Sequence, residues 1–204
     1  MQIRIVGPRD TVSNKEKLVN TTSHSQTWTR DLSPFHLGPI PLYSGKSALR
    51  MENAWQYAKV YSEHLTKDGN PSPSYWEWAE SGWANSSAVR YPKGKGAKPV
   101  FLLWDTQHLD YIEARLQVYW RLYRDSVRLT EGFSRLRNLA NAGPVTLFDF
   151  DGRDLDLKQE PLSVALLDPL RPMGHAFVLK SMLLYGELVE PDEVIEATKP
   201  LVLF

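Results

Sequence analysis

The sequence contains no cysteine among its 204 residues. This absence excludes thiolate nucleophiles, disulfide bridges and metal sites with cysteine ligands. Long apolar runs are missing as well: no stretch approaches the roughly eighteen residues of a membrane span, and the first residues, Met-Gln-Ile-Arg-Ile-Val, lack the apolar region of a secretion signal. We therefore expect a cytoplasmic protein without a membrane partner.

An excess of charge of either sign is also lacking, since 24 basic residues balance 24 acidic ones. A global attraction to nucleic acid is not expected, although a local basic patch can still bind a polyanion. The basic residues are densest at 90–99, Arg-Tyr-Pro-Lys-Gly-Lys-Gly-Ala-Lys-Pro, which predicts a basic loop. Its glycines and lysines suit phosphate oxygens, but the motif is not a P-loop, and a solvated loop is an equal alternative.

The length suits one domain over 1–204. The apolar periodicity predicts a mainly α fold, an α+β chain with a few short strands, in which segment 9–46 is mostly irregular. Helices are predicted at about 48–66 (capped by Ser47), 73–84, 109–129, 130–142 and 173–185, strands at 2–7 and 145–152, and either a strand or a helix lead-in at 100–104.

The most informative segment is 51–61, where a carboxylate, a carboxamide and an amine recur at offsets of four and seven. On a helix these offsets place Glu52, Gln56 and Lys59 on one face, while Trp55 and Ala58 belong to an apolar stripe. A Glu and a Lys at helical spacing are most often a solvated pair worth a few tenths of a kcal/mol. The alternative is a potential nucleophile on a buried helix.

Two features of the sequence favour a ligand-binding site at this segment. The preceding segment 32–39, Leu-Ser-Pro-Phe-His-Leu-Gly-Pro, is a punctuated loop of the kind that holds ligands. The chain also has seven Trp and nine Tyr, which together suit a site that stacks on a flat heterocycle, although for any one ring core packing is the commoner role.

Two further groups are candidates for binding. Asp149 and Asp151 are separated by one residue, so on a strand they point the same way and can bind a cation or ribose hydroxyls. Because no other acids cluster with them, we expect no metal site. His175 follows Gly174, which permits close approach of a ligand, whereas His36 in its loop has the more usual structural role.

With these motifs the chain resembles the NADAR family, which is associated with NAD and ADP-ribose metabolism. The signature of that family joins a Ser-Pro-Phe loop, here beginning at Ser33, to a helix with Glu, then Gln four and Lys seven residues later. A weaker similarity extends to segment 173–179. The Trp-Gly pair of the family is replaced by 149–152, Asp-Phe-Asp-Gly, so the chain resembles a divergent member.

The resemblance implies a compact helical fold and an N-glycosidase that needs neither a cofactor nor a metal. Lys59 would attack the anomeric carbon and form a Schiff base, Glu52 would exchange protons with the leaving base, and Gln56 would orient the substrate. The further substrate-binding candidates are Arg30, Arg90 and Lys93 for a diphosphate, Phe35, Trp83 and Trp104 for stacking, and Ser33, Asp149, Asp151, Gly174 and His175.

The most specific substrate that the resemblance implies is ADP-ribosylated guanine in nucleic acid, with a toxin-like ADP-ribosyltransferase as a candidate partner. One alternative is a free ribosylamino nucleotide of the riboflavin pathway, which the neutral net charge favours. The other is a non-catalytic module that binds ADP-ribose or a nucleotide.

Overall fold

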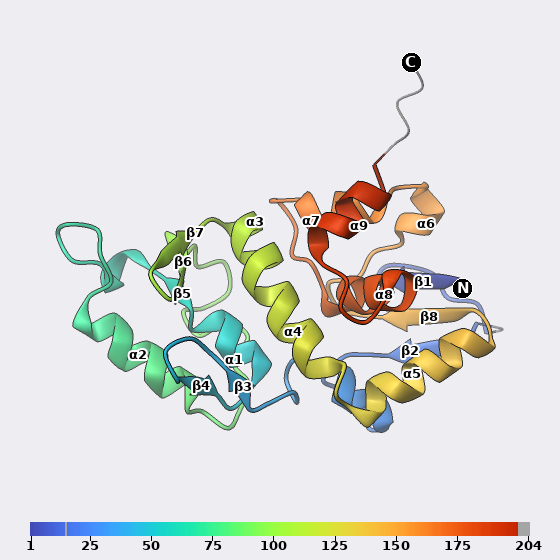
Figure 1. Ribbon diagram of the computed structural model, residues 1–204, viewed down its shortest axis with the longest axis horizontal. Helices are drawn as coiled ribbons and strands as arrows, with labels where there is room; N and C mark the ends of the chain where they lie inside the picture. Colours follow the sequence, from blue (N-terminus) through green and yellow to red (C-terminus); the bar gives the residue numbers. More distant parts are fainter. Residues whose placement is uncertain (15, 200–204) are drawn as a thin grey trace, which may run out of the picture. The chain divides into compact units, whose positions relative to one another are not determined.

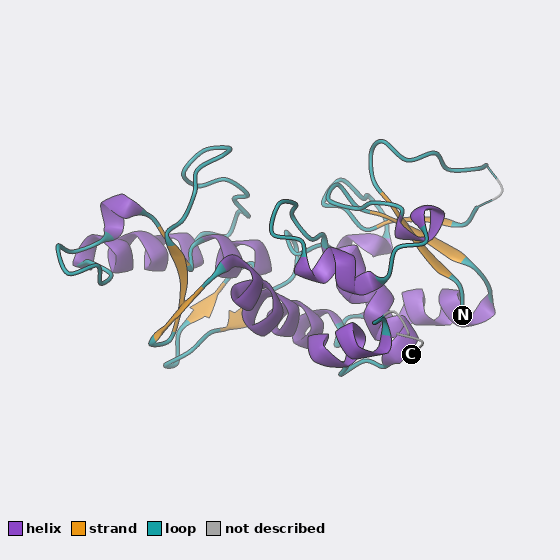
Figure 2. Cartoon of the chain, turned by 90° about the horizontal axis from the view of Figure 1, so that it is seen from above, coloured by secondary structure: helices purple, strands orange, loops and turns teal. Residues whose placement is uncertain are grey.

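The computed structural model describes residues 1–14 and 16–199. Helices outweigh short strands, which confirms the α+β class; Figure 1 gives the element order and Figure 2 shows how little of the chain is strand. The chain forms two compact units: a first unit of Met1–Ser33 with Tyr123–Phe204, and a second unit of Pro34–Leu122. The single domain and the NADAR-like fold remain predictions.

A parallel three-stranded sheet is the centre of the first unit. Its middle strand β8 (Val145–Phe148) pairs with β1 (Ile3–Val6) on one side and with β2 (Leu18–Asn20) on the other. Nearly every side chain of β1 and β8 is buried, as is usual for a parallel sheet covered on its faces. The strand predicted at 2–7 is confirmed, whereas the one at 145–152 was too long, because the chain turns after Phe148.

The helices of the first unit follow the predicted apolar pattern where that pattern is long. Helix α5 (Glu131–Ala142) begins after Thr130, whose hydroxyl accepts a hydrogen bond from the Phe133 amide at 3.0 Å, as predicted. Helix α8 (His175–Tyr185) lies against β1 (Figure 1), and nearly all of its side chains are buried. The other helical segments are the end of α4 (Trp120–Val127), α6 (Leu155–Lys158), α7 (Leu162–Leu167), α9 (Pro191–Ala197) and a 3₁₀ turn at Trp28–Leu32.

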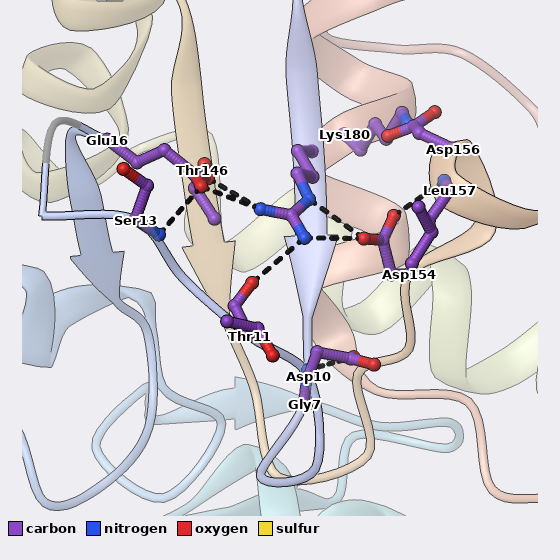
Figure 3. Close-up of polar contacts among 11 residues, drawn as sticks. Gly7, Asp10, Thr11, Ser13, Glu16, Thr146, Asp154, Asp156, Leu157 and Lys180 are labelled. Carbon is purple, nitrogen blue, oxygen red and sulfur yellow. Dashed lines mark hydrogen bonds and ion pairs between the residues drawn. The ribbon is translucent and has the colours of Figure 1, made fainter.

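Arg4 on β1 ties distant segments of the first unit together (Figure 3). Its guanidinium donates to Asp154 at 2.6 and 2.8 Å and to Glu16 at 2.7 and 2.8 Å. Hydrogen bonds from the Thr146 hydroxyl, from the Ser13 amide and from Arg4 lower the pKa of Glu16 to about 2. The network links β1, β8 and the loop before β2.

The second unit combines two small antiparallel sheets with helices. Predicted helix 73–84 is confirmed as α2 (Pro73–Trp83), and run 100–104 is a strand. The helix predicted at 109–129 is found from 111 to 127 and contains a π-helical turn at Arg115–Tyr119. Its residues from Tyr123 onward belong to the first unit. The remaining elements are β3 (Ile40–Pro41), β4 (Ser47–Ala48), α1 (Met51–Gln56), β5 (Lys59–Val60), a 3₁₀ turn at Ser62–His64, β6 (Phe101–Trp104), β7 (Gln107–Leu109) and α3 (Tyr111–Ala114).

The helix predicted at 48–66 is wrong in its extent. Helix α1 ends at Gln56, the chain turns, and Lys59 begins β5, where it pairs with Leu102 of β6. Ser47 is not a helix cap, because it belongs to β4. The sequence after the turn, Lys-Val-Tyr, is rich in strand-favouring residues, and pairing with β6 outweighs the weak helical periodicity.

Candidate active site

The predicted loop lies against the start of α1. The Glu52 amide donates to the Pro34 carbonyl at 3.0 Å, and the Met51 amide donates to the Leu37 carbonyl at 2.9 Å. The first amides of a helix have no partner within the helix, so the loop carbonyls satisfy them. Gly38 closes the loop with a φ of 148°, and a Cβ there would lie 2.2 Å from the Leu49 carbonyl oxygen, so glycine is required.

The three polar residues of the motif form a hydrogen-bonded row. The Lys59 Nζ donates to the Gln56 Oε1 at 2.6 Å, and the Gln56 Nε2 donates to the Glu52 Oε1 at 2.8 Å. Glu52 and Gln56 are only 6% and 7% exposed, whereas Lys59 is half-buried. The turn after α1, rather than a second helical turn, brings the amine back over Gln56.

An aromatic ring lies beside the amine. The Lys59 Nζ lies 5.0 Å from the centre of the Trp55 ring, and Trp55 meets Tyr119 edge-on at 5.2 Å. A cation over an indole face is favoured, but the ring also excludes water from the amine. The apolar cluster beneath Trp55 consists of Ala58, Leu102, Leu109, Ala114 and Val118.

These surroundings change the protonation of the lysine. Burial lowers the pKa of Lys59 from 10.5 to about 8; the charge of Glu52 opposes this shift and the charge of Arg90 adds to it. An amine with such a pKa is neutral in a substantial fraction near pH 7.5, and the neutral amine is the nucleophile. Gln56 also matters, because the row joins Lys59 to a neutral amide rather than directly to a carboxylate.

Asn53 was missed by the sequence analysis. Its side chain is fully buried; its Nδ2 donates to the carbonyls of Asn85 and Ser87, each at 3.0 Å, and its Oδ1 accepts from the Val89 amide at 2.8 Å. These bonds hold segment 85–89, and Arg90 directly follows it. The available signal was an Asn between Glu52 and Ala54 inside a helix, a position that Asn occupies at a cost unless its side chain is bonded.

The basic loop 90–99 has neither helix nor strand. Lys93 pairs with Glu63 at 3.1 Å and lies 5.3 Å from the centre of the Trp78 ring, whereas Lys95 and Lys98 are exposed. Part of the positive charge of this loop is therefore already partnered within the second unit.

Three aromatic candidates have different environments. Phe35 in the loop is half-buried. Trp83 is 2% exposed and belongs to the core, which removes its ring from reach of a base in this conformation. Trp104 is half-buried and meets Tyr43 edge-on at 5.1 Å.

The remaining candidates lie in the first unit. Arg30 is exposed in the 3₁₀ turn, and Ser33, which ends that turn, is buried. The structure brings Asp149, Gly174 and His175 together: the His175 Nδ1 lies 3.2 Å from the Asp149 Oδ2, and a Cβ on Gly174 would lie 2.2 Å from that oxygen.

Both sides of this Asp–His pair are occupied. The His175 Nε2 lies 2.8 Å from the Thr21 carbonyl oxygen, and Asp149 accepts from the amides of Ala176 and Asp151 at 3.0 and 3.1 Å. The expectation that Asp149 and Asp151 share a strand face is wrong, because both follow the end of β8. Asp149 is 3% exposed and serves to join the strand end to the start of α8.

The structure thus defines an α+β protein whose second unit holds a half-buried lysine in a polar row. The chain belongs to the family described as a family of unknown function, DUF6939, whose model matches residues 9–167. That span includes the loop, the row and Asp149. No curated protein and no solved structure gives a significant match to the chain. Across residues 1–14 and 16–199, no helix combines the length and the apolar character that crossing a bilayer requires.

Proposed function

We propose that the second unit carries an N-glycosidase site in which Lys59 is the nucleophile. The observation that carries the proposal is the row from Lys59 through Gln56 to Glu52, with an amine whose pKa is lowered to about 8. Buried lysines with lowered pKa values are typical of imine-forming sites. The resemblance to the NADAR family supports the same chemistry.

The reaction proceeds by substitution at the anomeric carbon of a ribosyl nucleotide. The Glu52 carboxylate first takes up the proton that Lys59 loses on becoming neutral. The neutral amine then bonds to the anomeric carbon as the bond to the base breaks, and the base leaves with the bonding electrons and takes the proton from Glu52. A proton moves from the substituted amine to the ring oxygen as the ribose ring opens, which gives a protonated imine. Water adds to the imine carbon, the neutral amine departs, and the released proton returns to Glu52, so the net change is hydrolysis.

The surrounding residues have supporting roles in this proposal. Gln56 holds the amine and the carboxylate apart while bonding to both. Trp55 offers a face on which a base or ribose can pack, and Arg90 supplies positive charge for a phosphate. The most specific substrate is ADP-ribosylated guanine in nucleic acid, for which exposed Lys95 and Lys98 add favourable charge.

A free ribosylamino nucleotide is the second candidate substrate. The contacts of Lys93 with Glu63 and Trp78 favour it, because they reduce the charge that the basic loop offers to a polymer. Salt separates the two candidates. Binding of modified DNA or RNA is expected to weaken steeply as salt rises, and binding of a small nucleotide much less.

The experiment is reductive trapping. The protein is incubated with ADP-ribosylated guanine DNA or with ribosylamino nucleotides, treated with borohydride, and analysed by peptide mass spectrometry. A sugar adduct on Lys59, retained in the control Lys158→Met and absent in Lys59→Met, supports the proposal. Stable binding of one substrate with neither adduct nor base release would overturn it and favour a binding module.

A further inference from the structure

We propose that the first unit holds a further binding site, a cavity between the outer edge of β2 and segment 24–29 that takes the base of a nucleotide. The cavity has a volume of about 390 Å³, within the range of small-molecule sites. Its walls are β2, the 3₁₀ turn that begins at Trp28, and Leu139 of α5. All of these segments belong to the first unit, whereas Lys59 belongs to the second, so this proposal does not rest on the proposed function.

The outer edge of β2 presents backbone groups to this cavity. In the order β1-β8-β2, strand β2 is an edge strand. The Lys17 carbonyl accepts a hydrogen bond from β8 and the Thr21 amide donates one to β8, each at 3.0 Å, so the backbone groups of residues 17, 19 and 21 face β8. Because these groups alternate in direction along a strand, the amide and carbonyl of Leu18 and the amide of Asn20 point the other way.

Segment 24–29 lies along this same side of β2. The Asn20 carbonyl, which also points away from β8, accepts a hydrogen bond from the Thr29 hydroxyl. The hydroxyl oxygens of Ser25 and Thr29 are 2.6 Å apart, and Ser25 is the donor between them because Thr29 gives its only proton to Asn20. These bonds fix the segment at one end of the strand, and the outward groups of Leu18 remain beside the cavity.

The edge groups suit a base better than a peptide strand. Strand β2 is only three residues long and its edge is closed at Asn20 by Thr29, so an added strand would find few backbone partners. The Leu18 carbonyl accepts and the Asn20 amide donates. A nucleobase carries a donor and an acceptor side by side on one edge and so complements this pair.

Trp28 supplies a face for the base. Its side chain is half-buried and lines the cavity together with Leu139. Gly132 keeps α5 close to the 3₁₀ turn, since a Cβ there would lie 2.7 Å from the Asp31 Cβ and 3.2 Å from the Trp28 carbonyl oxygen. Aromatic faces stack on every base, and Lys17, an exposed residue that lines the same cavity, offers its charge to a phosphate. A nucleotide combines the base and the anion that these groups complement.

The test is calorimetric titration with AMP and GMP, with the two nucleosides and ribose 5-phosphate as comparisons. At least one nucleotide is expected to bind, and Trp28→Ala is expected to weaken it about tenfold, because the stacking face is lost. Lys17→Met is expected to weaken the nucleotide about threefold and the matching nucleoside not at all, since only the nucleotide carries a phosphate. Trp76→Ala, which removes a half-buried indole of the second unit, is the control and is expected to leave binding unchanged.

Photolabelling with the 8-azido form of the bound nucleotide locates the site by peptide mass spectrometry. Adducts within 17–29 or α5 that persist in Lys59→Met support the proposal. Labelling confined to the second unit would overturn it, as would absence of binding by both nucleotides, unchanged affinity in Trp28→Ala, or ribose 5-phosphate binding as tightly as the nucleotide. If Trp28→Ala fails to fold, Leu139→Trp takes its place: it fills the cavity from α5 and is expected to abolish the adduct, and an adduct that remains would overturn the proposal.

Discussion

The two polar clusters of the molecule use similar residues in opposite ways. In the first unit, Asp149 and His175 are buried and bonded on both sides to backbone groups. In the second unit, Glu52 and Gln56 are buried but lead to Lys59, a half-buried amine whose pKa is lowered to about 8. One cluster ends in backbone groups, and the other ends in a half-buried amine.

We propose that this difference separates a structural role from a chemical one. An Asp–His pair looks catalytic from residue type alone, yet its partners are an amide at the start of α8 and the carbonyl of Thr21. The row ends in an amine with a lowered pKa, and perturbed protonation is typical of functional sites. The predictions below ask whether the first cluster governs stability and the second governs reactivity.

The largest effect is expected for Lys59→Met. Turnover and adduct formation are expected to fall by at least about a thousandfold, because the nucleophile is lost. Folding stability at pH 7 is expected to stay equal or to rise slightly, since the native state holds this amine at a pKa below its unfolded value and so loses stability as the pH falls from 10.5 to about 8. Thermal unfolding checks this; a large loss of stability would contradict it.

Asp149→Ala is expected to lower folding stability rather than reactivity, the opposite of Lys59→Met. It leaves the Ala176 amide, the Asp151 amide and the His175 Nδ1 without their carboxylate, so unfolding of the first unit becomes easier by about 3 kcal/mol. Denaturant unfolding gives the value. Asp151→Ala, which keeps its backbone amide, is the control and is expected to cost less than about 1 kcal/mol. Equal losses in both variants would remove the special role of Asp149.

Gln56→Glu tests the reactivity of the row with a side chain of nearly the same shape as glutamine. It places a carboxylate where an amide oxygen now accepts from Lys59 at 2.6 Å, and a negative charge so close raises the pKa of the amine. Turnover and the acetylation of Lys59 by acetic anhydride at pH 7.5 are expected to fall about tenfold, a loss recovered as the pH rises. Gln56→Met removes the bond without adding charge and is the matched control. A pH profile equal to wild type would contradict the account.

The smallest effect is expected for Glu16→Gln. The folded pKa of Glu16, about 2, lies below the unfolded value of 4.5, so its stabilisation is present above pH 4.5 and is lost as the pH falls through about 2. Burial raises the pKa of Asp154, but hydrogen bonds from Arg4 and the Leu157 amide make the net shift downward and add to the same acid window. The variant is expected to flatten the pH dependence of amide exchange in β1. An unchanged slope would mean that other groups control it.

The sequence predicted the elements whose signals are local. Thr130 capped α5 as expected, because cap and apolar periodicity lie within one turn of each other. The pairing of β1 with β8 could not be predicted, since about 140 residues separate the strands and neither carries a signal for the other. The helix predicted at 48–66 is too long because a 3.6-residue period was continued through the turn after Gln56. The strand that follows this turn, β5, pairs with β6, and the paired residues Lys59 and Leu102 are 43 positions apart.

The sequence predicted which residues lie together in the candidate site better than it predicted how they are arranged. Spacing placed Glu52, Gln56 and Lys59 together, and they do meet, but through a strand rather than a helix face. The role of Asn53 was missed because its partners are backbone groups of a loop, which no side-chain pattern reveals. Backbone groups also surround Asp149 and His175, whose contact with a ligand stays a prediction.

The most direct test of the central claim is the pKa of Lys59 in the wild-type protein without substrate. Lysines labelled with ¹³C at Cε are titrated by NMR, and the Lys59 signal is assigned by its loss in Lys59→Met. The account predicts a titration midpoint at about 8, well below the ordinary 10.5. A midpoint at 10.5 or above would show an ordinary charged lysine, and the nucleophile assigned to this site would be wrong.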